Sequence, residues 1–166
     1  MLPAYVPNSA AAAVGGGMPI DLGKTRSDGT RLFGDGKTIR GFFGGVACGC
    51  LIGGLQIIAQ GSSALSFLPQ HTPLSVILLA TGALVGDMVK SFFKRRAGIE
   101  RGASWPFVDQ YDFVAGAFAF LIIGAPAFAL SSLTLPVILT ILILTPVLHR
   151  VVNIIGYKLG VKDVPW

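Results

Sequence analysis

Residues 41–86, "GFFGGVACGCLIGGLQIIAQGSSALSFLPQHTPLSVILLATGALVG", contain no Lys, Arg, Asp or Glu. A helix that crosses a membrane needs about 20 apolar residues, so this stretch is long enough for two crossings. The turn-forming run "QGSSALSFLPQHTP" (60–73) divides it near the middle. We therefore expect a hairpin of two membrane-spanning helices, near residues 41–60 and 73–92.

A second uncharged stretch, residues 113–149, predicts another pair of spans. Its dividing turn is "LSSLTLP" (130–136), so the two helices are expected near 113–131 and 133–152. The first 20 residues are also uncharged but rich in Ala, Gly and Pro, and we expect a fifth, short span there.

The composition supports the same fold class. The chain is 52% hydrophobic and 13% charged, whereas soluble domains carry about 25% charged residues. We predict an all-α polytopic membrane protein with four or five spans, in which two cytoplasmic loops form a polar cavity. Residues 1–166 are expected to be a single domain.

The charged residues all lie in three segments, residues 21–40, 87–112 and 150–166. Helical hairpins join these segments, so they are expected on one side of the membrane, and the positive-inside rule makes that side cytoplasmic. We therefore expect a cell-membrane protein with its active site on the cytoplasmic face. A small anion transporter is the less favoured alternative, because a transport path needs polar groups near mid-span and the span centres have almost none.

Asp87 lies within the last turns of the predicted 73–92 span, where a carboxylate is costly unless it is paired or binds a metal. Helical spacing places Asp87, Ser91 and Lys94 on one face, with Lys90 one turn before Lys94. A purely structural Asp–Lys pair is the alternative interpretation. Gly82 and Gly86, on the same helix, would let another backbone or a ligand approach closely.

Asp109 and Asp112 are three residues apart at the start of the third predicted span, so they share a face. Acids at a helix N-terminus can simply cap it. Together with Asp87, however, they provide three carboxylates at one membrane surface. Mg²⁺ is held by one or two carboxylates together with substrate phosphates and water, so the sequence predicts a Mg²⁺ site for a phosphate ligand.

Gly36-Lys37-Thr38 looks like the end of a nucleotide-binding P-loop. The motif requires a glycine at position 31, which is Arg31 here, and the following residues form a predicted membrane span rather than a soluble helix. We exclude a P-loop fold and expect Lys37 and Thr38 to bind phosphate by another architecture.

The segments "SFFKR" (91–95) and "DQYD" (109–112) resemble the signature of the CTP-dependent phosphatidate cytidylyltransferases, the CDP-diacylglycerol synthases. Ser91, Lys94 and Arg95 match its Ser-x-x-Lys-Arg part, and the two acids match those of its Asp-Arg-x-Asp part. Glu100-Arg101 replaces a lysine–aspartate pair of that family, and Gln110 replaces an arginine. The small size, "DGKTIRG" (35–41) and "KDVPW" (162–166) are similar to the archaeal branch, the CDP-archaeol synthases.

This resemblance implies transfer of CMP from CTP to a lipid phosphate, an unsaturated archaetidic acid (2,3-di-O-geranylgeranylglyceryl phosphate), with Mg²⁺ as cofactor. Together with the charge pattern above, it leads us to expect Asp87, Asp109 and Asp112 as metal ligands, and Asp87 and Lys94 as catalytic residues. The expected substrate-binding residues are Lys37, Thr38, Arg40, Lys90, Ser91, Lys94, Arg95 and Asn153. The expected partners are CTP, the lipid phosphate and membrane lipids, not nucleic acid, and a homodimer is one candidate assembly.

Some interpretations stay open. A phosphatidyltransferase that consumes a CDP-lipid is the second candidate enzyme, although its D-G-x-x-A-R…G-x-x-x-D-x-x-x-D pattern is absent. Asp35 is either a metal or ribose ligand or part of an Asp-Gly turn. His149, Asn153 and Tyr157 recur every fourth residue near the end of the last span, where they either line the cavity or anchor the helix at the interface.

Overall fold

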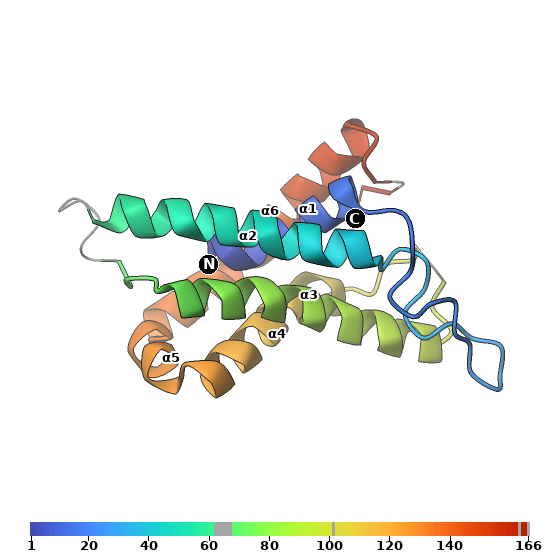
Figure 1. Ribbon diagram of the computed structural model, residues 1–166, viewed down its shortest axis with the longest axis horizontal. Helices are drawn as coiled ribbons and strands as arrows, with labels where there is room; N and C mark the ends of the chain where they lie inside the picture. Colours follow the sequence, from blue (N-terminus) through green and yellow to red (C-terminus); the bar gives the residue numbers. More distant parts are fainter. Residues whose placement is uncertain (62–67, 101, 163, 166) are drawn as a thin grey trace.

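The computed structural model describes residues 1–61, 68–100, 102–162 and 164–165. These residues form no strands, only two isolated bridges, which confirms the all-α prediction. The described helices are α1 (Leu2–Val14), α2 (Ile39–Gln60), α3 (Pro73–Arg96), α4 (Val108–Gly124), α5 (Pro126–Ser132) and α6 (Leu135–Lys158) (Figure 1).

Three of the described helices, α2, α3 and α6, are long and apolar enough to cross a membrane. Helices α2 and α3 form the predicted hairpin, although residues 62–67 of its connection lie outside the described part of the chain. The helix predicted at 113–131 is in fact two, because the backbone leaves the helical conformation at Ala125. The reason is Pro126, since a proline disfavours the α conformation of the residue before it.

Helix α1 occupies the predicted first segment but is only 13 residues long. At 1.5 Å per residue it extends about 20 Å, less than the roughly 30 Å of a hydrocarbon core. It instead packs against α2 and α3, with Pro3, Ala4 and Pro7 buried.

Glycines allow α1 to lie directly on α2. The buried residues of α2 are Gly41, Gly45, Gly49 and Gly53, which recur every fourth residue and so share one face. A Cβ atom at Gly45 would lie 2.7 Å from the backbone oxygen of Pro7. Side chains on this face would push α1 away, so these glycines allow the two helices to pack closely.

Glycines also bring α3 and α4 into backbone contact. A Cβ atom at Gly82 would lie 2.6 Å from the backbone oxygen of Gly116, and one at Gly86 would collide with the backbone oxygen of Asp112. The approach predicted from Gly82 and Gly86 is therefore that of another helix. It fixes the carboxyl-terminal half of α3 against the first turns of α4, where the acidic residues lie.

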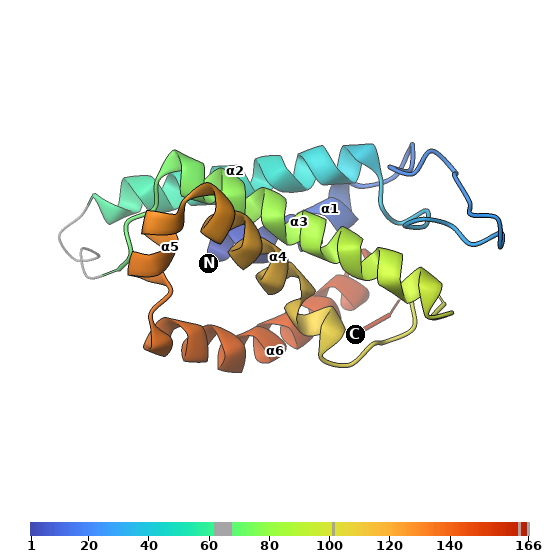
Figure 2. The same ribbon diagram turned by 90° about the horizontal axis from the view of Figure 1, so that it is seen from below.

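Helix α6 runs along the edge of the bundle (Figure 2), and its Ile141 joins the hydrophobic core formed with α1, α3 and α4. Its buried residues are Ile141, Thr145 and Asn153. Two tyrosine hydroxyls bond to it: the Oη atom of Tyr5 lies 2.6 Å from Oγ1 of Thr145, and the Oη atom of Tyr111 donates to the backbone oxygen of Leu142 at 2.7 Å. Polar contacts thus hold α6 to α1 and α4.

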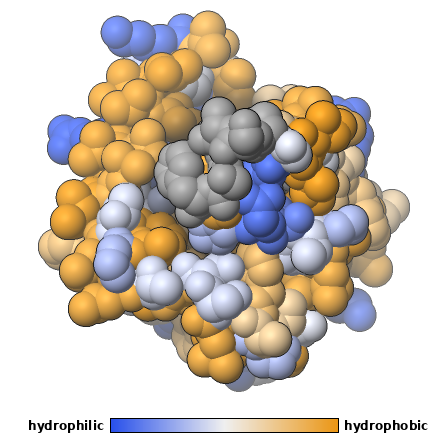
Figure 3. Space-filling model, turned by 90° about the vertical axis from the view of Figure 1, so that its left-hand side faces the viewer, coloured by the Kyte–Doolittle hydropathy of each residue, from blue (hydrophilic) through white to orange (hydrophobic). Residues whose placement is uncertain are grey.

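The charged segments gather in one half of the molecule. The loop before α2, the end of α3, the start of α4 and the end of α6 all lie in the right-hand half of Figure 1. The opposite end shows mainly hydrophobic residues, with hydrophilic ones near its centre (Figure 3). This arrangement agrees with the predicted placement of charge on one side, as far as the described residues reach; Arg101 and Asp163 lie outside them.

Candidate active site

A cavity of about 560 Å³ lies in the charged half of the molecule. Helices α1, α3, α4 and α6 contribute to its wall, together with the loop before α2, the loop after α3 and the C-terminal tail. Its charged, histidine and asparagine lining residues are Asn8, Lys37, Asp87, Lys90, Lys94, Asp109, Asp112, His149, Asn153 and Lys162.

Lys90 lies where the three predicted acids meet. Its Nζ atom is 2.9 Å from Oδ1 of Asp87, 3.3 Å from Oδ1 of Asp109 and 2.7 Å from Oδ2 of Asp112. The close contact of α3 with α4 makes this possible, because it places the last turns of α3 beside the first turns of α4. One ammonium group thus faces three carboxylates.

The predicted Mg²⁺ ligands lie together, but they face an ammonium group. The described residues contain no group of three or more His, Cys, Asp or Glu side chains arranged to hold a metal ion. The Oδ2 atom of Asp112 is buried, and its partner among the described residues is the ammonium group of Lys90 at 2.7 Å. This oxygen has lone pairs free for a further cation. Metal binding by Asp87, Asp109 and Asp112 stays a prediction.

Lys37 reaches the same acids from the loop before α2 and forms an ion pair with Oδ2 of Asp87. Two backbone hydrogen bonds hold the end of this loop: Ile20 N donates to the oxygen of Lys37 at 2.8 Å, and Ile39 N donates to that of Met18 at 3.0 Å. The Gly-Lys-Thr segment thus contributes its lysine to the cavity without a P-loop.

Asp21 organises this loop. Its buried carboxylate accepts hydrogen bonds from the Arg31 guanidinium, at 2.6 Å, and from the backbone N–H groups of Gly23, Phe33 and Gly34. Burial raises the pKa of this carboxyl, but Arg31 and the backbone donors outweigh it and hold the pKa of Asp21 well below its usual range. Asp35 is exposed and pairs with Arg31 at 2.6 Å, which favours its structural interpretation.

Asp21→Asn is expected to loosen the loop that carries Lys37. The amide lacks the negative charge that Arg31 binds and can accept fewer of the five donated hydrogen bonds, each worth about 1.5–3 kcal/mol where a charged group takes part. Hydrogen exchange should show faster exchange of the Phe33 and Gly34 amides. Asp28→Asn is the matched control, because Asp28 is exposed and bonds only Thr30 among the described residues. Equal exchange in both variants would contradict this role.

Lys94 and Asp109 fold the loop between α3 and α4 back toward the cavity. The Nζ atom of Lys94 donates to both carboxylate oxygens of Asp109 at 3.1 Å and to the backbone oxygen of Ala103 at 2.6 Å. Asp109 also accepts from the backbone N–H of Trp105 at 2.6 Å. Lys94 and Asp109 both line the cavity, but here each bonds other groups of the protein rather than a substrate.

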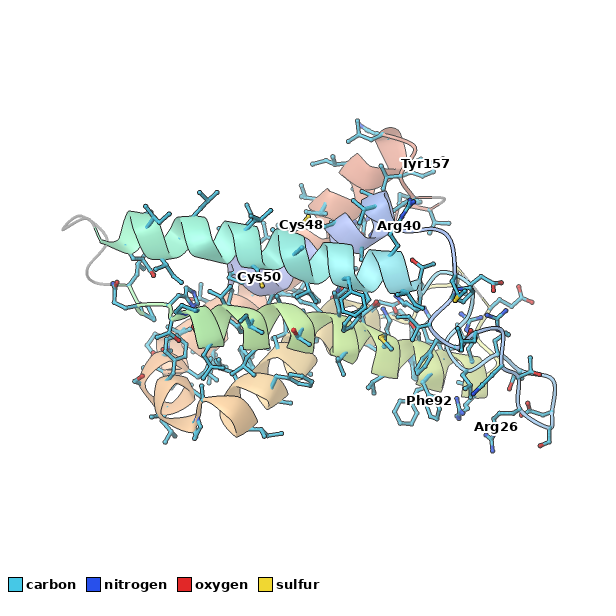
Figure 4. The ribbon with its side chains drawn as sticks, viewed as in Figure 1. Arg26, Arg40, Cys48, Cys50, Phe92 and Tyr157 are labelled. Atoms are coloured by element: carbon cyan, nitrogen blue, oxygen red, sulfur yellow. The ribbon has the colours of Figure 1, made fainter. Side chains whose placement is uncertain are left out.

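Four other predicted substrate-binding residues, Thr38, Arg40, Ser91 and Arg95, are not among the described residues that line the cavity. Thr38 caps α2 by accepting from Gly41 N at 3.1 Å, and Ser91 donates to the backbone oxygen of Asp87 at 2.9 Å. Arg40 bonds the backbone oxygens of Val14 and Gly15 at the end of α1, where Figure 4 shows it. Their roles toward substrate stay predictions.

The last helix contributes His149 and Asn153 to the cavity, whereas Tyr157 is 49% exposed and lies outside it. Asn153 is buried, and its amide nitrogen lies 3.2 Å from Nδ1 of His149. Its amide oxygen accepts a hydrogen bond from Lys162. Lys162 was not among the predicted site residues. The only signal was its place in the "KDVPW" ending used for the family resemblance.

Comparisons with known proteins agree with this resemblance. The family model described as "CarS-like: CDP-archaeol synthase" matches residues 1–166. Curated proteins named CDP-archaeol synthase from Methanoculleus marisnigri and Methanospirillum hungatei are 61% and 59% identical over 166 residues, each covering 100% of both chains. A solved structure titled "Structural insight into an intramembrane enzyme for archaeal membrane lipids biosynthesis" is 42% identical. It covers 80% of this chain and 82% of its own, with a TM-score of 0.65.

Proposed function

Since the chain belongs to the CDP-archaeol synthase family, we propose that it transfers CMP from CTP to the phosphate of an unsaturated archaetidic acid. The observation that carries this proposal is the cavity in which Lys37, Lys90, Lys94 and Lys162 meet three aspartates. The phosphate oxygens of a substrate can replace the aspartate carboxylates as partners of these ammonium groups. The site therefore supports a reaction between phosphates at a membrane surface.

The cavity also has an apolar side, which supports a lipid as one of the two substrates. Leu2 and Val6 of α1, and Leu148 and Val152 of α6, line the same space as the charged residues. The phosphate of a lipid would lie among the lysines while the first part of its chains contacts these apolar groups.

The proposed reaction is a displacement at phosphorus. An oxygen of the lipid phosphate attacks the α-phosphorus of CTP, the bond from this phosphorus to the oxygen bridging to the β-phosphate breaks, and pyrophosphate leaves with the bond electrons. The protein contributes positioning and charge neutralisation, since little covalent work is needed. Lys37, Lys90 and Lys94 would bind the phosphate oxygens of both substrates and stabilise the charge that develops on the leaving pyrophosphate.

The residues present fit a Mg²⁺ ion. The buried Oδ2 atom of Asp112, whose partner among the described residues is Lys90, lies beside Asp87, and two carboxylates with phosphate oxygens and water suffice for this ion. We place the ion at Asp87 and Asp112: Lys37 and Lys90 would leave these acids for phosphate oxygens, whereas Asp109 would keep its bonds to Lys94 and to the backbone of Trp105. When bound, Mg²⁺ would neutralise phosphate charge. The proposed location of the site is the cytoplasmic face of the cell membrane, which follows from the Lys and Arg of the adjoining loops.

Asp112→Asn is expected to raise the Mg²⁺ concentration needed for half-maximal activity by about tenfold or more, because removing a metal ligand or its support costs about 10–100-fold in affinity. The same titration on Asp109→Asn should leave this concentration nearly unchanged while lowering the maximal rate. A higher Mg²⁺ requirement for Asp109→Asn but not for Asp112→Asn would assign the metal to Asp109.

Label transfer tests the proposed reaction. The purified protein, reconstituted in liposomes with archaetidic acid and Mg²⁺, should move label from [α-³²P]CTP into the lipid fraction and label from [γ-³²P]CTP into pyrophosphate. Reactions without the lipid phosphate, or with ATP in place of CTP, are the controls. Consumption of a CDP-lipid with no use of CTP would favour the phosphatidyltransferase alternative, and no transfer in either assay would overturn the proposal.

A further inference from the structure

The segment after α6 turns back toward the cavity. Gly160 adopts a left-handed conformation (φ 70°), its N–H donates to the oxygen of Tyr157 at 3.0 Å, and the N–H of Val161 donates to the oxygen of Gly156 at 2.9 Å. These two bonds define a Schellman motif, which ends a helix and reverses the chain. Lys162 follows immediately, and its own N–H also bonds the oxygen of Gly156, at 3.2 Å.

The reversal places the Lys162 side chain inside the cavity. Its aliphatic part lies against Gly156, where a Cβ atom would be 3.4 Å from Cγ and Cδ of the lysine. Its Nζ atom donates to Oδ1 of Asn153, which is only 2% exposed and is held in turn beside His149. The position of the ammonium group is therefore set by a buried amide and by the helix cap.

Lys162 differs from the other lysines of the cavity in its charge environment. Lys37 pairs with Asp87, Lys90 faces all three aspartates and Lys94 pairs with Asp109. No carboxylate of the described residues forms an ion pair with Lys162. Burial lowers the pKa of Lys162, and the charges of Lys37 and Lys90 lower it further, whereas the more distant charge of Asp87 raises it.

The described residues that line the cavity carry more positive than negative charge. Among these residues, three lysines balance three aspartates, and Lys162 supplies a further positive charge. Lys162 is half-buried, and within the described part of the chain its ammonium group bonds a neutral amide rather than a carboxylate, so it has the environment of a group that binds an anion. The anions of the proposed reaction are the phosphates of the nucleotide and of the lipid.

We propose that the Lys162 ammonium group binds a phosphate group of a substrate in this cavity, and that Asn153 is the residue that positions it. The inference rests on the proposed function. It adds to the site a residue that comes from the C-terminal tail and lies far in sequence from the Ser-x-x-Lys-Arg and Asp-x-x-Asp segments. The ligand chemistry is that of a phosphate ester, whether it comes from CTP or from the lipid headgroup.

Kinetics of Lys162→Met test the inference, with Lys158→Met as the matched control. Lys158 lies on the exposed side of the same helix end, so its loss removes one charge outside the cavity. Lys162→Met should raise one KM about tenfold or more, since a charge-assisted hydrogen bond to phosphate is lost. A rise in the KM for CTP identifies the nucleotide phosphate, and a rise in the KM for archaetidic acid identifies the headgroup. Lys162→Arg, which keeps the charge, should recover most of the affinity.

Direct binding provides a readout independent of turnover. Calorimetry with Mg²⁺ and CTP, and separately with archaetidic acid in mixed micelles, should show the same loss for Lys162→Met, and a smaller one for Asn153→Ala. Unchanged binding and KM, or a fall in kcat alone, would overturn the inference and leave the proposed function intact. An inactive wild-type protein would instead remove the proposed function itself. Matching thermal unfolding of wild type and Lys162→Met establishes that the fold is retained.

Discussion

Asp87→Asn is expected to lower the rate of CDP-lipid formation at least about 100-fold, a loss typical of removing a group that organises charge in an active site. Asp87 pairs with Lys37 from the loop and with Lys90 from its own helix, so it joins two of the cations that would bind phosphate. The amide removes the charge that holds both lysines and also removes a proposed metal ligand. Initial rates at saturating CTP, lipid phosphate and Mg²⁺ measure the effect.

The control for this variant is Asp35→Asn. Asp35 belongs to the same polar half of the protein, but it is exposed and pairs only with Arg31 among the described residues. Asp35→Asn should retain activity within about twofold, because substitutions of exposed residues away from buried contacts and charge networks usually have small effects. If Asp87→Asn kept near-normal activity, Asp87 would be a structural partner of Lys37 and Lys90, and the proposed chemistry would lose its central acid.

Gly86→Ala is expected to lower both stability and activity. The added methyl group would collide with the backbone oxygen of Asp112, at the contact that brings α3 and α4 together. Relief requires the two helices to separate, and overpacking of this kind costs about 1–3 kcal/mol. Because the same contact brings Lys90 to Asp109 and Asp112, we expect activity to fall even at temperatures where the variant stays folded.

Gly54→Ala is the matched control, since a Cβ atom at Gly54 would meet nothing within 4 Å. Both substitutions gain the helix propensity of alanine, about 1 kcal/mol over glycine, so their difference isolates the helix contact. Thermal unfolding in detergent and the CDP-lipid assay should separate the two variants. Equal melting temperatures and rates would show that the contact of α3 with α4 does not determine the geometry of the site.

The helices could be predicted because apolar stretches between charged segments have few alternatives in a membrane. Helices α2 and α3 follow from the uncharged residues 41–86, and the turn chemistry at 60–73 divides them. The break at Ala125 was missed because Pro126 lies inside an apolar run, where a single proline signals either a kink or an end. Helix α1 was expected as a short segment, but its contact with the glycine face of α2 is a tertiary property.

The acids of the site and the two lysines of α3 were predictable from local spacing, whereas Lys37 was predicted only from its short motif and Lys162 was not predicted. Asp87, Lys90 and Lys94 share a helix, and Asp109 and Asp112 share another, so each group could be assigned to one face. Lys37 and Lys162 come from a loop and from a reversed tail, and periodicity does not place such residues.

Two predicted ligands illustrate a further limit. Thr38 and Arg40 are predicted ligands because their side chains suit phosphate, but each side chain instead forms a hydrogen bond with the backbone at a helix end. Residue chemistry alone does not distinguish a cap from a ligand, because both need the same donors and acceptors. Asp21, by contrast, was not assigned to the site, yet it organises the loop that carries Lys37.

A structure of the protein with CTP and Mn²⁺ in place of Mg²⁺ tests the central claim most directly. We expect the triphosphate in the cavity among Lys37, Lys90 and Lys94, with the anomalous signal of the Mn²⁺ beside Asp87 and Asp112 and with the ammonium group of Lys90 moved from the acids to phosphate oxygens. A nucleotide bound outside this cavity, or a metal distant from both aspartates, would contradict the account.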